Sequence, residues 1–142
     1  MGFGDAVRTG FRKYVEFSGR ASRSEYWWWA LFNFLVWLVA IVLDAVIFPG
    51  SGRYGNYFGL LSSIASLALF LPNLAVGVRR LHDTDRSGWW LLISVIPIIG
   101  WIILLIFLVS SGTPGANRFG PPPAGARGLL DTDFRPETPG AL

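Results

Sequence analysis

The sequence contains no cysteine, one histidine and one methionine in 142 residues. The absence of cysteine excludes disulfides, thiolate metal sites and cysteine nucleophiles. Charged residues are also scarce, at 15% of the chain, whereas hydrophobic residues make up 52%. Soluble domains usually carry more charge than this. We therefore expect a membrane protein, and we expect neither a cofactor nor a bound metal ion.

The apolar residues gather in three long runs, at about 27–48, 58–78 and 89–109. Each run holds roughly 20 residues, the length that crosses about 30 Å of hydrocarbon as a helix. The sequence thus predicts an all-α integral membrane protein with about three transmembrane helices, the third kinked at Pro97–Gly100. Buried helices of a soluble protein are the alternative, but these are normally shorter and have a polar face. The first run is too long for the apolar core of a signal peptide, so we expect it to be retained.

The segment before the first run predicts two structural features, an amphipathic helix and a helix N-cap. Apolar residues follow helical spacing over residues 3–17, with charged residues on the other face, which is typical of an amphipathic interfacial helix. Packing of this helix against the protein's own connector is the alternative. Further on, Ser22 and Glu25 have the spacing of a capping box, so we expect Ser22 to be the N-cap of the first membrane helix.

The cations indicate the orientation. The net charge is +3, but Lys and Arg next to apolar runs are orientation signals, so we expect no nucleic-acid partner. Five of the twelve cations precede the first run and three lie in 79–86, and these eight would be cytoplasmic if the N-terminus is inside. Three crossings then place the C-terminal tail outside. A re-entrant third run would instead return "NRFGP", residues 117–121, to the cytoplasmic side.

The stretch "RRLHDTDRSG", residues 79–88, places six ionisable side chains between two apolar runs. His82, Asp83 and Asp85 are metal-capable, and His82 could serve as a general acid or base. Their spacing matches no recognisable metal site, however, and no nucleophile motif accompanies them. We favour a structural role, in which Arg20 or Arg23 pairs with Asp83 or Asp85 at the membrane surface.

A few polar residues interrupt the runs, where burial in lipid is costly. Asn33 and Asn73 could line a polar cavity, but hydrogen bonding between helices is the favoured role. Asp44 could face water or pair with Arg53. After residue 109 the chain becomes rich in Gly and Pro, so we expect one membrane domain over 1–121 and a disordered tail over 122–142.

Three blocks together resemble a known family. They are "YVEFSGRASRSEYWWWALFN", the stretch that contains "RRLHDTDRSGWW", and "SGTPGANRFGP". Their order is similar to that of the bacterial inner-membrane family called domain of unknown function 805. The resemblance implies a small multi-pass inner-membrane protein, with no established activity to transfer.

We expect a non-enzymatic membrane component without catalytic residues, which binds membrane lipids or a membrane protein partner. An oligomeric transporter or channel subunit is one alternative, and a homo-oligomer is required for it because three helices enclose little pathway. A membrane enzyme acting on lipid headgroups through His82 and Asp83 is another. The candidate polar network or partner site consists of Arg20, Arg23, Glu25, Arg79, Arg80, His82, Asp83, Asp85 and Asn117.

Overall fold

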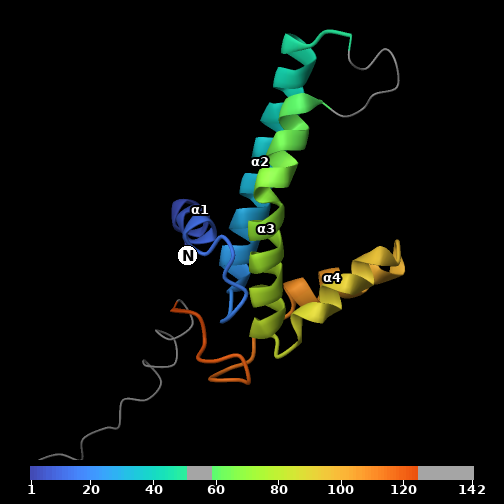
Figure 1. Ribbon diagram of the computed structural model, residues 1–142. Helices are drawn as coiled ribbons and strands as arrows, with labels where there is room; N and C mark the ends of the chain where they lie inside the picture. Colours follow the sequence, from blue (N-terminus) through green and yellow to red (C-terminus); the bar gives the residue numbers. More distant parts are fainter. Residues whose placement is uncertain (51–58, 125–142) are drawn as a thin grey trace, which may run out of the picture.

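The computed structural model describes residues 1–50 and 59–124, and this part of the chain is all-helical (Figure 1). Five helices and no strand occur in it. A single bridge between Asn117 and Gly120 closes a turn near its C-terminal end. The helices are α1 (Phe3–Arg12), α2 (Arg23–Ile47), α3 (Leu60–Asp83), the 3-10 helix η2 (Gly88–Val95) and α4 (Ile99–Val109). Most of the predicted tail, residues 125–142, lies outside the described residues.

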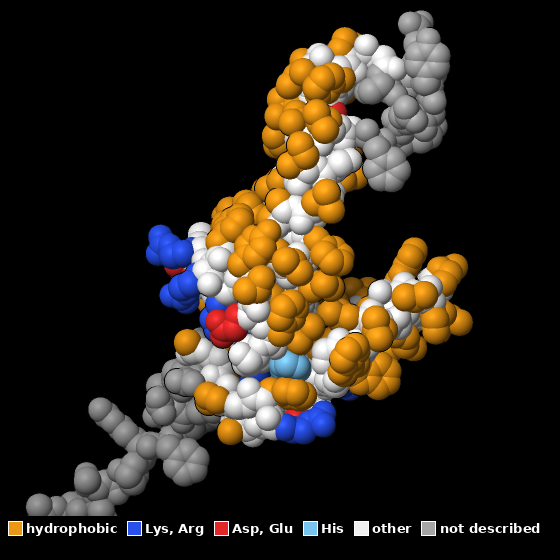
Figure 2. Space-filling model, viewed as in Figure 1, with side chains coloured by type: hydrophobic (Ala, Val, Ile, Leu, Met, Phe, Trp, Pro, Cys, Tyr) orange, Lys and Arg blue, Asp and Glu red, His pale blue; other side chains and the backbone are white. Residues whose placement is uncertain are grey.

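Helices α2 and α3 form a long antiparallel pair (Figure 1). Both are long and apolar enough to cross a membrane, with 25 and 24 residues. Only 11% of the most apolar stretch of α2 is buried, and 33% of that of α3. Figure 2 shows hydrophobic side chains over most of the visible surface of the pair. A soluble core helix buries its apolar face, so these helices fit a lipid environment instead.

The two ends of the pair are capped by side chains. Ser22 accepts a hydrogen bond from the Glu25 amide at 3.1 Å, which confirms it as the N-cap of α2. At the far end, Asp44 accepts hydrogen bonds from the amides of Leu61 and Ser62, both at 2.8 Å. Asp44 is only 5% exposed, so it neither faces water nor needs a cation. The positive N-terminus of α3 supplies its partner. Arg53, the partner that we had considered, lies outside the described residues.

Helix α1 packs on α2 through its smallest residues. Ala6, Thr9 and Gly10 are buried, and a Cβ atom at Gly10 would lie 2.3 Å from the Trp29 ring. Phe11 contacts the same ring edge-to-face at 5.5 Å. The helix ends at Arg12 and not at residue 17, and its main neighbour is the first long helix, α2. Its bulky apolar residues stay half-exposed, as an interfacial position requires.

Helix α3 continues through most of the polar stretch and ends at Asp83. Residues 79–83 are therefore its last turn, and the connector to η2 is only residues 84–87. This rigid backbone fixes the spacing of the charges, because side chains three or four residues apart lie on one face of a helix.

The third apolar run is not a single kinked helix. It forms a hairpin in which η2 and α4, of 8 and 11 residues, run back along each other. The chain reverses at 96–98, where Ile98 has a φ of 67°. Trp101 ties the two arms together by donating to the Ser94 carbonyl at 2.9 Å. Neither arm alone is long enough to cross 30 Å. The expected third span is therefore replaced by two short segments, because Pro97 lacks an amide hydrogen and Gly100 permits close contact.

We predict that Gly100→Ala opens the hairpin. A Cβ atom at this position would lie 1.9 Å from the Ile93 carbonyl oxygen, and backbone cannot move aside as a flexible side chain can. Overpacking of this kind costs about 1–3 kcal/mol. The melting temperature of the detergent-purified protein should fall by several degrees. Gly4→Ala is the matched control, since nothing lies within 4 Å of its Cβ position. Equal melting temperatures for the two variants would contradict the tight hairpin.

Candidate functional site

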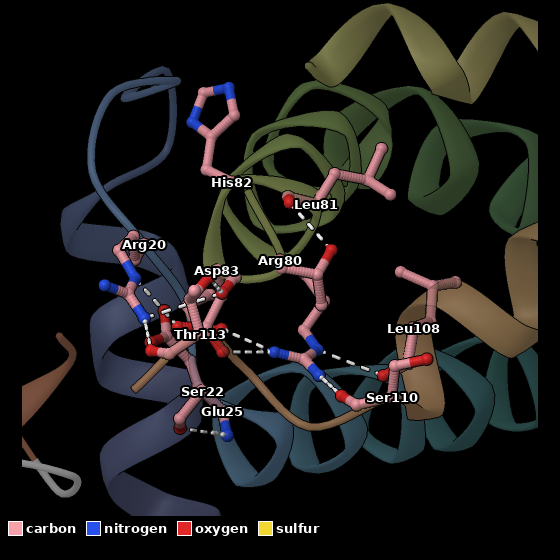
Figure 3. A network of polar contacts seen from close by, with 12 residues as sticks. Arg20, Ser22, Glu25, Arg80, Leu81, His82, Asp83, Leu108, Ser110 and Thr113 are labelled. Atoms are coloured by element: carbon pink, nitrogen blue, oxygen red, sulfur yellow. Dashed lines mark hydrogen bonds and ion pairs between the residues drawn. The ribbon is translucent and has the colours of Figure 1, made fainter. Parts of the chain in front are cut away.

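The Asp83 carboxylate lies between two arginines. Arg20 Nε donates to Asp83 Oδ1 at 2.9 Å, and Arg80 Nη1 donates to Oδ2 at 2.5 Å. The three side chains are 1%, 0% and 6% exposed for Arg20, Arg80 and Asp83. Figure 3 shows the two guanidinium groups approaching the carboxylate from opposite sides. We call Arg20, Arg80 and Asp83 the arginine clasp. The expected Arg20–Asp83 pair is thus confirmed, with Arg80 as a second partner.

Backbone carbonyls at the end of α4 and just beyond it balance the second positive charge of the clasp. Arg80 donates to the carbonyls of Leu108, at 3.0 Å, and Ser110, which end α4. Arg20 donates to the carbonyls of Thr113 and Gly115, both at 2.6 Å. The last carbonyls of a helix lack intrahelical partners and carry partial negative charge. The clasp therefore caps the C-terminus of α4 while it neutralises Asp83.

The segment after α4 also satisfies the end of α3. The amide and hydroxyl of Thr113 donate to the Asp83 carbonyl at 2.8 and 2.9 Å. Asn117 Nδ2 donates to the His82 carbonyl at 2.9 Å. A Cβ atom at Gly112 would lie 2.1 Å from an Asp83 carboxylate oxygen, so only glycine permits this approach. All three sequence motifs consequently meet at one end of the molecule.

A second buried ion pair lies beside the clasp. Arg79 Nη1 donates to Glu25 Oε1 at 2.5 Å, and the two side chains are 0% and 5% exposed. Among the described residues, Arg79 Nε and Nη2 have no hydrogen-bond partner. Its carbonyl accepts from the Ala21 amide at 2.9 Å. The pair therefore joins α2 to α3, and Arg79 depends on Glu25 for its only side-chain hydrogen bond in this part of the chain.

His82 lies on the other side of the last turn of α3. Its Nδ1 is 3.1 Å from the Gly19 carbonyl, and its ring stacks on Phe119 at 3.8 Å between centroids. His82 lines a hollow of about 410 Å³ together with Phe17 and Trp89. Asp83 lines a different hollow, of about 290 Å³. The two residues thus do not converge on a common space, as shared acid–base chemistry would need.

Two of the expected residues lie at the periphery. Arg23 is exposed and forms no ion pair among the described residues. Asp85 pairs with Arg118 at 3.2 Å, with both side chains largely exposed, so this pair contributes little. The described residues also contain no group of three side chains suited to a metal ion.

Sequence reasoning missed the partners that are backbone atoms. Carbonyl groups of residues 108, 110, 113 and 115 complete the clasp, and a carbonyl has no residue type that could reveal it. The only available signal was the "SGTPG" composition, which permits close approach of the chain. Phe119 was visible in "NRFGP", but its stacking on His82 was not.

We predict that Asp83→Asn destabilises the protein more than the neutralisation of an exposed charge does. The substitution leaves two buried guanidinium groups without a counter-charge, at a cost of about 3–5 kcal/mol. Thermal stability in detergent should fall strongly. Asp85→Asn is the control, because its exposed pair is worth less than about 1 kcal/mol. If Asp83→Asn and Asp85→Asn have the same melting temperature, the clasp does not stabilise the fold.

Comparison with known proteins identifies relatives. A family model described as "Protein of unknown function (DUF805)" matches residues 14–121, which contain the whole predicted polar network. Inner membrane protein YhaH of Escherichia coli (strain K12) is 49% identical over 112 residues, 79% of this chain and 90% of YhaH. Inner membrane protein YhaI of that strain is 46% identical, covering 79% and 89%. Uncharacterized protein YiiR is 32% identical, covering 62% and 53%.

No solved structure gives a significant match. The names of YhaH and YhaI give a location but no activity. The chain therefore belongs to the DUF805 family of proteins of unknown function and, like these relatives, to the inner membrane.

Proposed function

We propose that this protein is a non-enzymatic, multi-pass component that binds anionic lipid at the cytoplasmic face of the inner membrane. In this proposal the arginine clasp is structural, and it holds the hairpin of η2 and α4 in the cytoplasmic leaflet. One observation carries the proposal: the buried charges of the first two motifs are paired with one another and with backbone carbonyls, several of which come from the third motif. In this proposal, binding is therefore carried out by the exposed surfaces of the protein and not by the buried charges.

The topology follows from the hairpin. Because Arg80 binds the carbonyls of Leu108 and Ser110, α4 ends at the same end of α3 as the clasp. The cation distribution favours a cytoplasmic location for that end. The third run would thus enter and leave the membrane on one side, with both chain ends inside. Its turn suits that depth, since the amides of Ile99 and Gly100 bond to the carbonyls of Pro97 and Ile96.

Helix α1 supports the lipid-binding part of the proposal. Arg8 and Arg12 are exposed one turn apart and have no ion pair among the described residues. Phe3 and Phe11, also partly exposed, flank the packed face. Figure 2 shows Lys and Arg side chains gathered at the lower part of the molecule. A helix with apolar residues beside cations lies in the membrane interface and attracts anionic headgroups.

The alternatives receive less support. A headgroup enzyme would use His82 with Asp83, but these line different hollows, and Asp83 is enclosed by the clasp. A channel or transporter subunit would need several copies, because two crossing helices enclose no pathway between them.

The proposed topology predicts the location of reporter fusions. Green fluorescent protein fused after Leu142 should fluoresce, and alkaline phosphatase at the same place should be inactive, because the C-terminus is cytoplasmic. Alkaline phosphatase inserted after Gly50, between α2 and α3, should be active and serves as the positive control. An active phosphatase after Leu142 would restore the three-crossing arrangement.

The lipid proposal predicts a charge-dependent enrichment. The full-length protein, purified from mixed phosphatidylglycerol and phosphatidylethanolamine nanodiscs, should retain phosphatidylglycerol when examined by native mass spectrometry. Arg8→Gln with Arg12→Gln should reduce that retention at least severalfold, since each cation at the surface is worth about 1 kcal/mol.

Arg118→Gln is the matched control, because it removes an exposed cation from the C-terminal loop and should leave retention near the wild-type value. Equal retention by the double variant and the wild type would refute anionic lipid binding by α1. Melting temperatures close to the wild-type value would show that the substitutions leave the fold intact.

A further inference from the structure

A groove between α2 and α3 contains two amide side chains within otherwise apolar walls. It measures about 430 Å³ and is open to the outside. Asn33 and Asn73 lie on its two walls, with Trp37, Ser66 and Phe70 beside them. Helix α1 does not cover it, since α1 and the residues after it reach α2 and α3 at Phe32 and Ala68, which are not among the lining residues.

Each amide is half-satisfied, and its orientation is fixed. Asn33 Nδ2 donates to the Trp29 carbonyl at 3.0 Å, so its Oδ1 is the remaining acceptor. Asn73 Oδ1 accepts from Trp29 Nε1 at 2.7 Å, so its Nδ2 is the remaining donor. Neither remaining group has a hydrogen-bond partner among the described residues. The groove thus presents one amide oxygen and one amide nitrogen that have no partner in the described part of the chain, on opposite walls.

The two groups lie at the same depth. Asn33 is ten residues after the start of α2 at Arg23, and Asn73 is ten residues before the end of α3 at Asp83. At 1.5 Å per residue, each is about 15 Å from the clasp end of its helix. Lipid chains offer no hydrogen bonds at that depth, so polar side chains there face other protein segments or a water-filled space. In membranes such groups join helices.

We propose that this groove is the contact surface between two copies of the chain. A two-fold axis along the membrane normal would place Asn33 Oδ1 of one copy opposite Asn73 Nδ2 of the other. The operation repeats the bond, so all four remaining groups are satisfied. Ala65 and Ser66 on the wall allow close approach of a helix. A second copy is favoured over an unrelated helix because the donor and acceptor are complementary to each other. The inference goes beyond lipid binding and does not depend on it.

The chain without cysteine permits a direct test by cross-linking. Two differently tagged full-length copies, one with Trp37→Cys and one with Phe70→Cys, are co-expressed and oxidised in membranes. These positions lie on opposite walls, 14 and 13 residues from the clasp ends of their helices. We expect a disulfide that joins the two differently tagged copies. Leu67→Cys in place of Phe70→Cys is the control: Leu67 is 77% exposed but does not line the groove, and should not cross-link.

The amides are tested by the dimer dissociation constant, measured by fluorescence energy transfer between labelled copies in lipid vesicles. Asn33→Leu removes two hydrogen bonds from the symmetric dimer and should weaken it about tenfold. Asn33→Gln keeps the carbonyl oxygen and should partly restore it. Asn73→Leu should have a similar effect, but it also removes the Trp29 partner, so Asn33→Leu is the decisive variant.

Three results would overturn the proposal. One is a protein that stays monomeric at every protein-to-lipid ratio. Another is a dimer that cross-links equally through Leu67→Cys and Phe70→Cys, which would show a different surface or random collision. The last is a dimer that Asn33→Leu leaves unchanged. None of these bears on phosphatidylglycerol retention, so the two proposals fail separately.

Discussion

The structure depends on placing one carboxylate between two guanidinium groups, with all three side chains almost fully buried. Asp83 alone could not be buried there, and neither could Arg20 or Arg80, because an isolated buried charge costs several kcal/mol. Together, and with carbonyl groups from residues 108–115, they are satisfied. Three segments far apart in the chain must therefore be present at once, which makes this end of the molecule a cooperative unit.

The same constraint explains why so many charges occur in so apolar a protein. Their role is to shape the backbone, because they hold the end of the apolar hairpin of η2 and α4 against the end of α3. Arg80 provides that attachment by capping α4, and Asn117 and Thr113 continue it. The surfaces that remain for binding, α1 and the groove between α2 and α3, lie on elements whose positions the charged cluster fixes.

Local signals in the sequence were sufficient to predict part of the fold and part of the charged cluster. The length of the apolar runs predicted α2 and α3, the spacing of Ser22 and Glu25 predicted the start of α2, and opposite charges at one face predicted the Arg20–Asp83 pair. The sequence favoured a crossing over the re-entrant alternative for the third run, because its 21 residues also satisfy the length rule for a span. What separates the two outcomes is the binding of backbone carbonyls by Arg80, and those atoms carry no residue identity. The amide partners of Asp44 were missed for the same reason, since a backbone amide has no residue type that reveals it.

The position of Leu108 and Ser110, 28 and 30 residues after Arg80, has a consequence for biosynthesis. The residues of α2 and α3 are synthesised before those at the end of α4. During that interval Arg80 lacks the carbonyls of Leu108 and Ser110, and Arg20 lacks those of Thr113 and Gly115. Completion of the fold thus waits for residues 108–115, and a nascent chain that stops short of them leaves the guanidinium groups of Arg20 and Arg80 with only part of their partners.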